Sequence, residues 1–395
     1  MTPKEQIFEI KKSEKPEVPE KETEPEISWS PEAEKQGKKL VEQISSLKQS
    51  LDQAEEKGDL KEQAKILDQI DHLVKRLEVL TEKETMPFEQ LTQKELKEQY
   101  ESQKNLCRER GFLQTFPNGQ EGIKDEEGNE YPFPDFKEIM TKLKKEDLYQ
   151  EKIEIFEKPL ILITPFALSP KKMANEYSKQ IEEHFVEERV DGERRIPNKN
   201  KTKLFGVNKD PLELRTDKEN VYFDDSLKNL LYFPEWKEQA GEIKPVNGIT
   251  KEQAIKQIGG WKISIIENIP LVPQKGQGET KQKEIKIKGK TKLIKRKPVE
   301  GGMNAAEQYN LLKQQNEQGL TIEDQIFYSM LYLRENNIVL DDDQRTNYYC
   351  RILGNCASGL VPFAYWRRGT RQADMFRYNP DTRDDRCGAR SAVMI

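Results

Sequence analysis

The sequence predicts an α+β fold, because helical and strand patterns occupy separate blocks of the chain. Helical patterns dominate the N-terminal part, short strand candidates fill residues 190–300, and strands and loops follow a last helix beyond Asp341. No regular alternation of strand and helix is present, which argues against a doubly wound parallel sheet.

Residues 1–30 consist mainly of lysine, glutamate and proline. A segment of this composition cannot bury enough apolar surface to offset the loss of chain entropy on folding, so we expect it to be disordered. It also lacks the apolar stretch of a secretory signal, and no run of roughly 20 apolar residues follows it. A cytoplasmic protein is the default expectation, with display at the cell surface left open.

Residues 31–84 carry two heptad-like apolar patterns, which predict an antiparallel helical hairpin or coiled coil. Ser30-Pro31 suits the start of the first helix, and Gly58-Asp59 offers an end cap followed by a start cap. Such a pair serves as a spacer or self-association element, or alternatively as a docking site for a partner helix. The apolar positions are Leu40, Ile44, Leu47, Leu51 and Ala54, and then Leu67, Ile70, Val74 and Leu77.

Residues 85–155 give mixed signals, and we interpret them as a linker region that contains a small hairpin around Gly128-Asn129. From about residue 156 the pattern is that of one folded domain. It begins with the buried strand Pro159–Pro165 and continues with a helix that starts at Ser169-Pro170. An alternating strand at Trp261 and a helix capped by Thr321 follow.

Composition sets outer limits on the fold and the function. Of the 395 residues, 34% are apolar and 35% are charged, so we expect one main domain with less compact additions. The net charge of −5 argues against general nucleic-acid binding. Four scattered cysteines are too few for a disulfide framework, and a reducing compartment is therefore expected.

Candidate chemistry outside the C-terminal region is sparse. His72 and His184 lie on helical patterns and are expected to be surface or packing residues. Cys350 and Cys356 have no second Cys or His pair nearby, so the sequence predicts no zinc site. We expect the protein to need no metal and no cofactor.

Two charged runs have alternative interpretations. Asp341-Asp342-Asp343 is interpreted as a solvated run rather than a cation site, because consecutive carboxylates converge on one ion only in a dedicated loop. Residues 281–297 hold nine Lys or Arg and one Glu, a local charge of 9 − 1 = +8. Phosphate binding is one interpretation. An exposed ribbon or mobile loop is favoured, because no aromatic residues lie among the basic ones.

Residues 361–395 are the most informative part of the chain. Aromatic, arginine and aspartate residues are mixed there without a clean two-residue or helical period. Aromatic and arginine side chains contribute most of the energy in binding interfaces, because they bury large rigid areas and make directed hydrogen bonds. We therefore expect a displayed binding surface, in which Trp366, Gly388, Arg390 and Val393 belong to the core. Arg371 and Arg390 are expected to hold its loops by pairing with carbonyls or carboxylates.

This region resembles the variable region of proteins that are diversified by diversity-generating retroelements. The resemblance rests on the order of Trp366, Arg371-Gln372-Ala373, Pro380 and the closing Gly-Ala-Arg-Ser-Ala-Val of residues 388–393. It covers about thirty residues, with a weaker match back to about residue 156. It implies a C-type-lectin-like domain over residues 156–395, related in fold to formylglycine-generating enzymes.

The resemblance also implies which residues vary and face a ligand. In such systems error-prone copying at adenines turns asparagine codons into codons for other residues. The implied ligand-facing positions are Arg367, Gly369, Thr370, Asp374, Phe376, Tyr378, Thr382, Asp385, Arg386 and Cys387.

The resemblance implies a non-enzymatic protein of receptor or adhesion type, whose ligand is a protein or a glycan. Two alternatives stay open. The first is an enzyme of the formylglycine-generating type, for which Cys350 and Cys356 are the candidate cysteine pair. The second is a structural or assembly protein that acts through self-association of residues 31–84.

Overall fold

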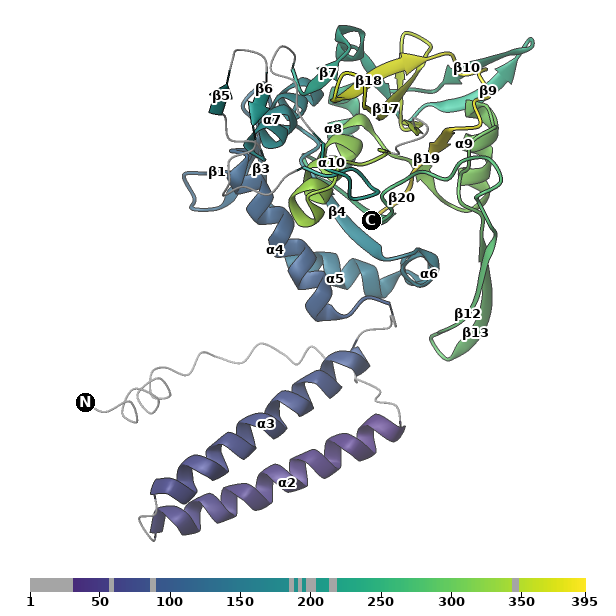
Figure 1. Ribbon diagram of the computed structural model, residues 1–395. Helices are drawn as coiled ribbons and strands as arrows, with labels where there is room; N and C mark the ends of the chain where they lie inside the picture. Colours follow the sequence, from purple (N-terminus) through teal and green to yellow (C-terminus); the bar gives the residue numbers. More distant parts are fainter. Residues whose placement is uncertain are drawn as a thin grey trace. The chain divides into compact units, whose positions relative to one another are not determined.

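A computed structural model describes residues 31–56, 60–85, 90–184, 188–190, 194–196, 204–212, 219–342 and 348–395. The chain folds as two compact units, residues 1–85 and residues 86–395. Both helices and sheets are present, in agreement with the predicted α+β class (Figure 1). The predicted disorder of residues 1–30 and the predicted turn at Gly58-Asp59 lie outside the described residues.

Within the described residues, the first unit contains α2 and α3, and the second contains the remaining elements. In chain order they are α2 (Pro31–Glu56), α3 (Leu60–Thr85), α4 (Gln93–Glu109), β1 (Gln114–Thr115), β2 (Glu121–Lys124), β3 (Glu130–Pro132), α5 (Phe136–Lys145), α6 (Asp147–Ile155), β4 (Pro159–Thr164), α7 (Pro170–Glu183), β5 (Glu188–Val190), β6 (Arg194–Ile196), β7 (Val221–Phe223), η1 (Asp225–Lys228), β8 (Leu230–Tyr232), β9 (Glu235–Gln239), β10 (Glu242–Val246), α8 (Lys251–Ile258), β11 (Lys262–Glu267), β12 (Lys281–Ile287), β13 (Lys290–Arg296), α9 (Ala305–Gln314), β14 (Gln318–Gly319), α10 (Ile322–Asn336), β15 (Tyr349–Arg351), β16 (Asn355–Ala357), β17 (Val361–Arg367), β18 (Gln372–Tyr378), β19 (Cys387–Ala389) and β20 (Ser391–Met394).

In the first unit, α2 and α3 lie side by side and run in opposite directions (Figure 1). The side chain of Gln63, near the start of α3, donates to the carbonyl of Ala54, near the end of α2, at 3.2 Å. Leu40, Ala54 and Ile66 are the apolar side chains buried in the described part of this unit. In α2 the predicted positions Leu40 and Ala54 are buried, whereas in α3 the predicted Leu67 is 54% exposed and Ile66, which was not predicted, is buried instead.

Two sheets and a buried helix organise the second unit. The antiparallel sheet has the strand order β14-β20-β11-β4, and the mixed sheet has the order β19-β15-β17-β18-β7. Helix α10 is buried almost all round, and the capping box predicted at Thr321 is present with Asp324. The alternation predicted for β11 is absent, because Ser264, Ile265 and Ile266 are all buried. A strand covered on both faces has no solvent side on which polar residues could alternate.

Residues 90–155 are part of this unit, which corrects their interpretation as a linker. Helix α4 covers the open edge of β4, where the side chain of Gln103 accepts from Ile163 N–H at 2.8 Å and donates to Ile161 O at 2.7 Å. Gln99, one turn earlier, satisfies the neighbouring backbone groups in the same way. An uncovered edge strand would expose a row of unpaired backbone groups. No unit boundary therefore exists near residue 155.

The basic run forms an anchored ribbon made of β12 and β13 (Figure 1). Its apolar side chains Ile285, Ile287 and Ile294 are buried, and three of its ion-pair partners lie on α6. Ion pairs within the protein neutralise most of the charge of +8. This argues against the two interpretations of the run as a phosphate-binding site and as a mobile loop. The paired basic side chains are Lys281, Lys283, Lys288, Lys292, Arg296 and Lys297.

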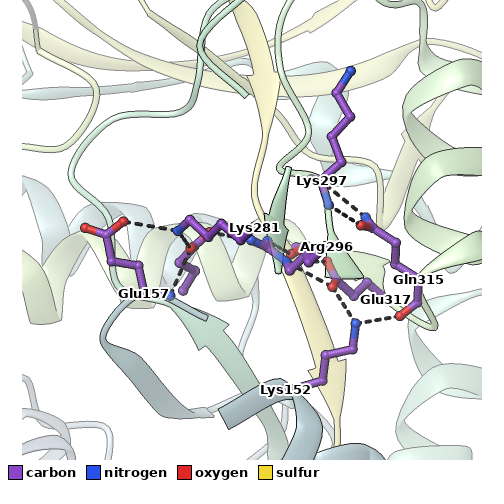
Figure 2. A network of polar contacts seen from close by, with 9 residues as sticks. Lys152, Glu157, Lys281, Arg296, Lys297, Gln315 and Glu317 are labelled. Carbon is purple, nitrogen blue, oxygen red and sulfur yellow. Dashed lines mark hydrogen bonds and ion pairs between the residues drawn. The ribbon is translucent and has the colours of Figure 1, made fainter. Parts of the chain in front are cut away.

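A buried ionic network fixes the base of this ribbon. Figure 2 shows the carboxylate of Glu317 between Lys152 and Arg296, at 2.6 Å and 3.0 Å. Nη1 of Arg296 pairs with Glu267 at 2.9 Å, and Nη2 donates to Ser391 Oγ at 3.0 Å. The network thereby joins α6, the ribbon and the strand β20 at the end of the chain.

Candidate ligand-binding surface

The hairpin of β17 and β18 displays the C-terminal aromatic residues. The strands pair along their whole length, from Val361 opposite Tyr378 to Arg367 opposite Gln372. Ala364 and Trp366 point into the core, whereas Phe363 and Tyr365 are half-buried on the outer side. Burial therefore alternates along β17, and the expectation that this region has no two-residue period was wrong for this strand. The strand lies in a sheet with one face packed on the core and one face outward.

Six aromatic side chains from four strands form one continuous cluster on this sheet, which we call the aromatic face. Cross-strand pairing explains it, because Phe363 lies opposite Phe376, and Tyr222 of β7 lies beside Asp374 in parallel register. Ring centroids of contacting neighbours are 4.8–5.9 Å apart. The members of the aromatic face are Tyr222, Tyr349, Phe363, Tyr365, Phe376 and Tyr378.

The buried carboxylate of Asp374 holds Arg367 against the aromatic face. Nε of Arg367 lies 2.5 Å from Oδ2 of Asp374, whose side chain is 1% exposed, and the guanidinium donates to the Tyr365 hydroxyl at 2.6–2.8 Å. The guanidinium also lies 5.5 Å from the ring centroid of Phe376. Burial raises the pKa of Tyr365 to about 12, so its hydroxyl stays protonated at neutral pH. Asp374 thus orients an arginine and does not itself reach solvent.

Arg386 borders the aromatic face from the loop before β19. It forms a bidentate pair with Asp384 at 2.9 and 3.0 Å, and its guanidinium lies 5.0 Å from the Tyr349 ring centroid. The hydrogen bonds from Arg386 lower the pKa of Asp384, which keeps this carboxylate ionised. The loop is also fixed by its backbone, since Thr382 O accepts from buried Arg351 at 3.0 Å.

Two further arginine–aspartate pairs fix the C-terminal part of the unit, one at the β17–β18 turn through Arg368 and one between β19 and β20 through Arg390. Arg390, 3% exposed, pairs with Asp341 at 2.6 and 2.9 Å, and Arg368 pairs with Asp342 at 2.6 and 2.7 Å. Both aspartates are 1% exposed, so the interpretation of this run as solvated charge was wrong. Asp341 and Asp342 can be buried because each carboxylate has an arginine partner. Asp343 lies outside the described residues. Trp366 and Val393 are also buried, as predicted.

The ten positions implied to face a ligand fall into four groups. Arg367, Phe376 and Tyr378 lie on or beside the aromatic face, and Gly369 and Thr370 form the turn at its end. Thr382, Asp385 and Arg386 lie in the loop between β18 and β19. Asp374 and Cys387 are buried, at 1% and 4% exposure, and differ in this from the expectation. Both point outward in the sheet register but are covered by neighbouring side chains, among them Arg367 over Asp374.

Four members of the aromatic face were not predicted. Phe363 and Tyr365 carry a usable signal, since they alternate with buried residues along β17. Tyr222 and Tyr349 carry no such signal. Tyr222, for example, lies about 150 residues before its neighbour Phe376 in the sequence. Pairing between distant strands, which a sequence pattern does not encode, brings them to this face.

The four cysteines are all reduced and buried. Cys350 is fully buried and its Sγ donates to Gln325 Oε1 at 3.4 Å, and burial raises its pKa to about 12. A reactive thiol needs the opposite environment, with partial exposure and a lowered pKa. This geometry gives the formylglycine-generating alternative no support.

We predict that the native protein does not react with a thiol reagent such as Ellman's reagent at pH 8. The reason is that Cys107, Cys350, Cys356 and Cys387 are all less than 5% exposed, and a buried thiol is inert. All four should react after denaturation in guanidinium. Rapid modification of one or two thiols in the native protein would instead revive the enzyme alternative.

Within the described residues, no group of three or more His, Cys, Asp or Glu side chains is arranged to hold a metal ion. In the same part of the chain, no helix has the length and apolar character that crossing a bilayer requires. No family model matches the sequence, and no match was found among curated proteins or solved structures.

Proposed function

We propose that this chain is a non-enzymatic ligand-binding protein, of receptor or adhesion type, which binds a protein or glycan through the aromatic face. The proposal includes a C-type-lectin-like domain whose C-terminal positions are diversified by a retroelement. It also includes a helical hairpin formed by α2 and α3. The observation that carries it is the cluster of six aromatic side chains on the outer side of the β17–β18 sheet.

Exposure of this cluster supports binding. Tyr222 and Tyr378 are 41% and 40% exposed, and large aromatic side chains at such positions are typical of interfaces rather than of free surface. Phe363 packs against Tyr378 at 5.5 Å and Phe376 packs against Tyr222 at 4.8 Å, so the exposed rings are held by half-buried ones. Rings that are already immobilised lose little side-chain entropy when a ligand binds.

Contacts beneath the outward side chains of the sheet support the proposal that these side chains can vary. The pair of Arg368 with buried Asp342 holds the hairpin at its turn, and the buried pair of Arg390 with Asp341 holds the segment between β19 and β20. Surface substitutions usually change stability by about half a kcal/mol or less. Outward positions of this hairpin can therefore change without loss of the fold, which is the property that a diversified surface needs.

The test is a screen of the immobilised full chain against a glycan array and a display library of protein fragments. We expect Tyr378→Ala and Tyr222→Ala each to weaken binding of the selected ligand by about tenfold or more, since truncation of an interface aromatic commonly costs this much. Arg386→Ala, at the edge of the face, should have a similar effect. The free energy of unfolding should change by less than about 1 kcal/mol in the two tyrosine variants.

Leu231→Ala is the matched control, because Leu231 is 39% exposed but lies on β8, away from the aromatic face. It should leave binding unchanged. Ligands that bind the face variants and the control equally would contradict the proposal. A large loss of stability in Tyr378→Ala would show that the residue is structural.

Diversification has an independent test in the neighbouring DNA. We expect a near-copy of the 3′ coding end that differs only at adenines, next to a reverse transcriptase gene. A complete locus without such a copy would remove hypervariability from the proposal but not ligand binding.

A further inference from the structure

A cleft of about 1360 Å³ lies in the second unit between α7, α8, β8 and the turn that joins β2 to β3. Its walls combine apolar side chains, such as Phe223 and Leu230, with charged side chains of both signs. Concave, partly apolar spaces with a few polar groups are the usual sites of small ligands. No member of the aromatic face lines this cleft, so it is separate from the proposed ligand-binding surface.

Lys251 reaches the cleft from a mostly dry environment. It is the first residue of α8, directly after the N-cap Thr250, and its side chain is 26% exposed. Its Nζ lies 3.8 Å from the ring centroid of Phe166 and 4.9 Å from that of Tyr232, and both rings are buried. The rings replace water around the amine, while the remaining exposure keeps the side chain within reach of a molecule in the cleft.

Two features of this environment disfavour the positive charge of Lys251. The first is the loss of water, and the second is the positive end of the helix dipole at the start of α8. Burial lowers the pKa of Lys251, although the nearby carboxylate of Glu323 acts in the opposite direction. Lys256 on the same helix is the opposite case, because its hydrogen bond to Glu252 raises its pKa. At neutral pH Lys251 is therefore more often the neutral amine, which is the nucleophilic form.

Glu323 provides an acceptor for the proton that Lys251 must lose. Its Oε1 lies 2.5 Å from Nζ of Lys251 and accepts from the Tyr232 hydroxyl at 2.7 Å. The side chain of Glu323 is fully buried, and its Oε2 accepts no hydrogen bond from the described residues. Oε2 can therefore carry a proton without the loss of an existing contact. Transfer of a proton from Nζ leaves a neutral amine beside a neutral acid, with no buried charge.

We propose that Lys251 binds a small organic aldehyde in this cleft, covalently and reversibly, as an imine. The nitrogen lone pair adds to the carbonyl carbon and forms the C–N bond. Both hydrogens of the amine pass to the carbonyl oxygen with Glu323 as the carrier, and this oxygen leaves as water when the C=N bond forms. The step releases one water for each ligand bound and needs no oxidant or reductant. It adds a second ligand site to the proposed function and does not depend on the aromatic face.

The experiment is reductive trapping of the imine in the full chain. The protein is incubated at pH 7 with benzaldehyde, in less than equimolar amount, and with cyanoborohydride, and the modified lysines are identified by peptide mass spectrometry. We expect most of the adduct on Lys251. Lys251 should be modified about tenfold or more faster than Lys256, because each unit of difference in pKa changes the fraction of neutral amine about tenfold.

Lys251→Arg removes the primary amine but keeps a cation for Glu323, so the total adduct should fall to the background level of exposed lysines with unchanged circular dichroism. Lys256→Arg is the matched control, because Lys256 lines the same cleft from the same helix and its side chain is 71% exposed. It should leave the adduct on Lys251 intact.

An adduct spread over the exposed lysines without preference for Lys251 would overturn the proposal. So would modification of Lys251 only after denaturation, which would show that the pair with Glu323 is purely structural. The map of modified lysines in the wild-type protein decides between these outcomes even if Lys251→Arg fails to fold. Ligand binding by the aromatic face would stand in every case.

Discussion

Replacing Arg390 by methionine is expected to lower the free energy of unfolding of the second unit by about 3–5 kcal/mol, the usual cost of breaking a buried ion pair. Arg390 is 3% exposed and Asp341 is 1% exposed. The guanidinium binds both carboxylate oxygens and also contacts the carbonyls of Ile269 and Pro270 at 3.3–3.4 Å. Methionine fills part of the volume but leaves a buried carboxylate without its cation.

Denaturation in guanidinium measures this loss, with tryptophan fluorescence as the signal. Trp236, Trp261 and Trp366 all lie in the second unit and report on its unfolding. Arg383→Met is the matched control, because Arg383 pairs with Glu307 while its side chain is 55% exposed. Exposed pairs contribute about 1 kcal/mol or less. Equal effects of Arg390→Met and Arg383→Met would contradict the role of the buried pair.

A second variant separates loss of the pair from loss of packing. Asp341→Asn added to Arg390→Met removes the unpaired charge and keeps an acceptor for the N–H of Val272, which binds Asp341 Oδ1 at 3.2 Å. The double variant should therefore be more stable than Arg390→Met alone. A double variant as unstable as the single one would attribute the loss to packing.

Replacing Glu317 by glutamine is expected to destabilise the second unit by a similar amount, about 3–5 kcal/mol. Its carboxylate is fully buried and is shared by Lys152, which is 7% exposed at the side chain, and Arg296, which is 3% exposed. Glutamine keeps the shape of the side chain but removes the negative charge of the only carboxylate that pairs with Lys152 among the described contacts. Glu157→Gln, a change in the exposed part of the same network in Figure 2, should cost about 1 kcal/mol or less.

The loss in Glu317→Gln should depend on pH. Burial lowers the pKa of Lys152, and the charge of Glu317 acts against this. Without that charge the folded-state pKa of Lys152 falls further below its unfolded value of about 10.4. The unfolded chain then binds more protons than the folded one, so stability rises with pH up to about pH 10. Denaturation at several pH values checks this: a loss that is equal at pH 6 and pH 10 would contradict it, and Lys152→Met should partly restore stability at pH 6.

The sequence identified elements whose signals are local. The buried strand β4, the start of α7 at Ser169-Pro170 and the capping box of α10 depend on neighbouring residues, and each is present. Residues 90–155 were misjudged, because Gln99 and Gln103 of α4 look like solvent-exposed helix residues until β4 lies beside them. Polar side chains that complete a sheet edge carry no hydrophobic pattern.

The charged runs show the same limit. The sequence shows that residues 281–297 are basic and that Asp341 and Asp342 are acidic, but it does not show their partners. Five of the nine basic residues and both described aspartates form ion pairs with residues well separated in the chain. A charge run is solvated or buried according to what folds against it, and sequence composition cannot distinguish the two.

By itself the sequence determined the α+β class and the helical patterns of residues 31–84, because short-range periodicity and composition specify these features. The predicted burial of Trp366, Arg390 and Val393 is also observed. Only the tertiary structure decided which side chains share the aromatic face. Tyr222 and Tyr349 join it through pairing of distant strands, and Asp374 leaves the surface because Arg367 lies over it. Register between strands and ion pairing across the core depend on contacts that form only when the whole unit folds.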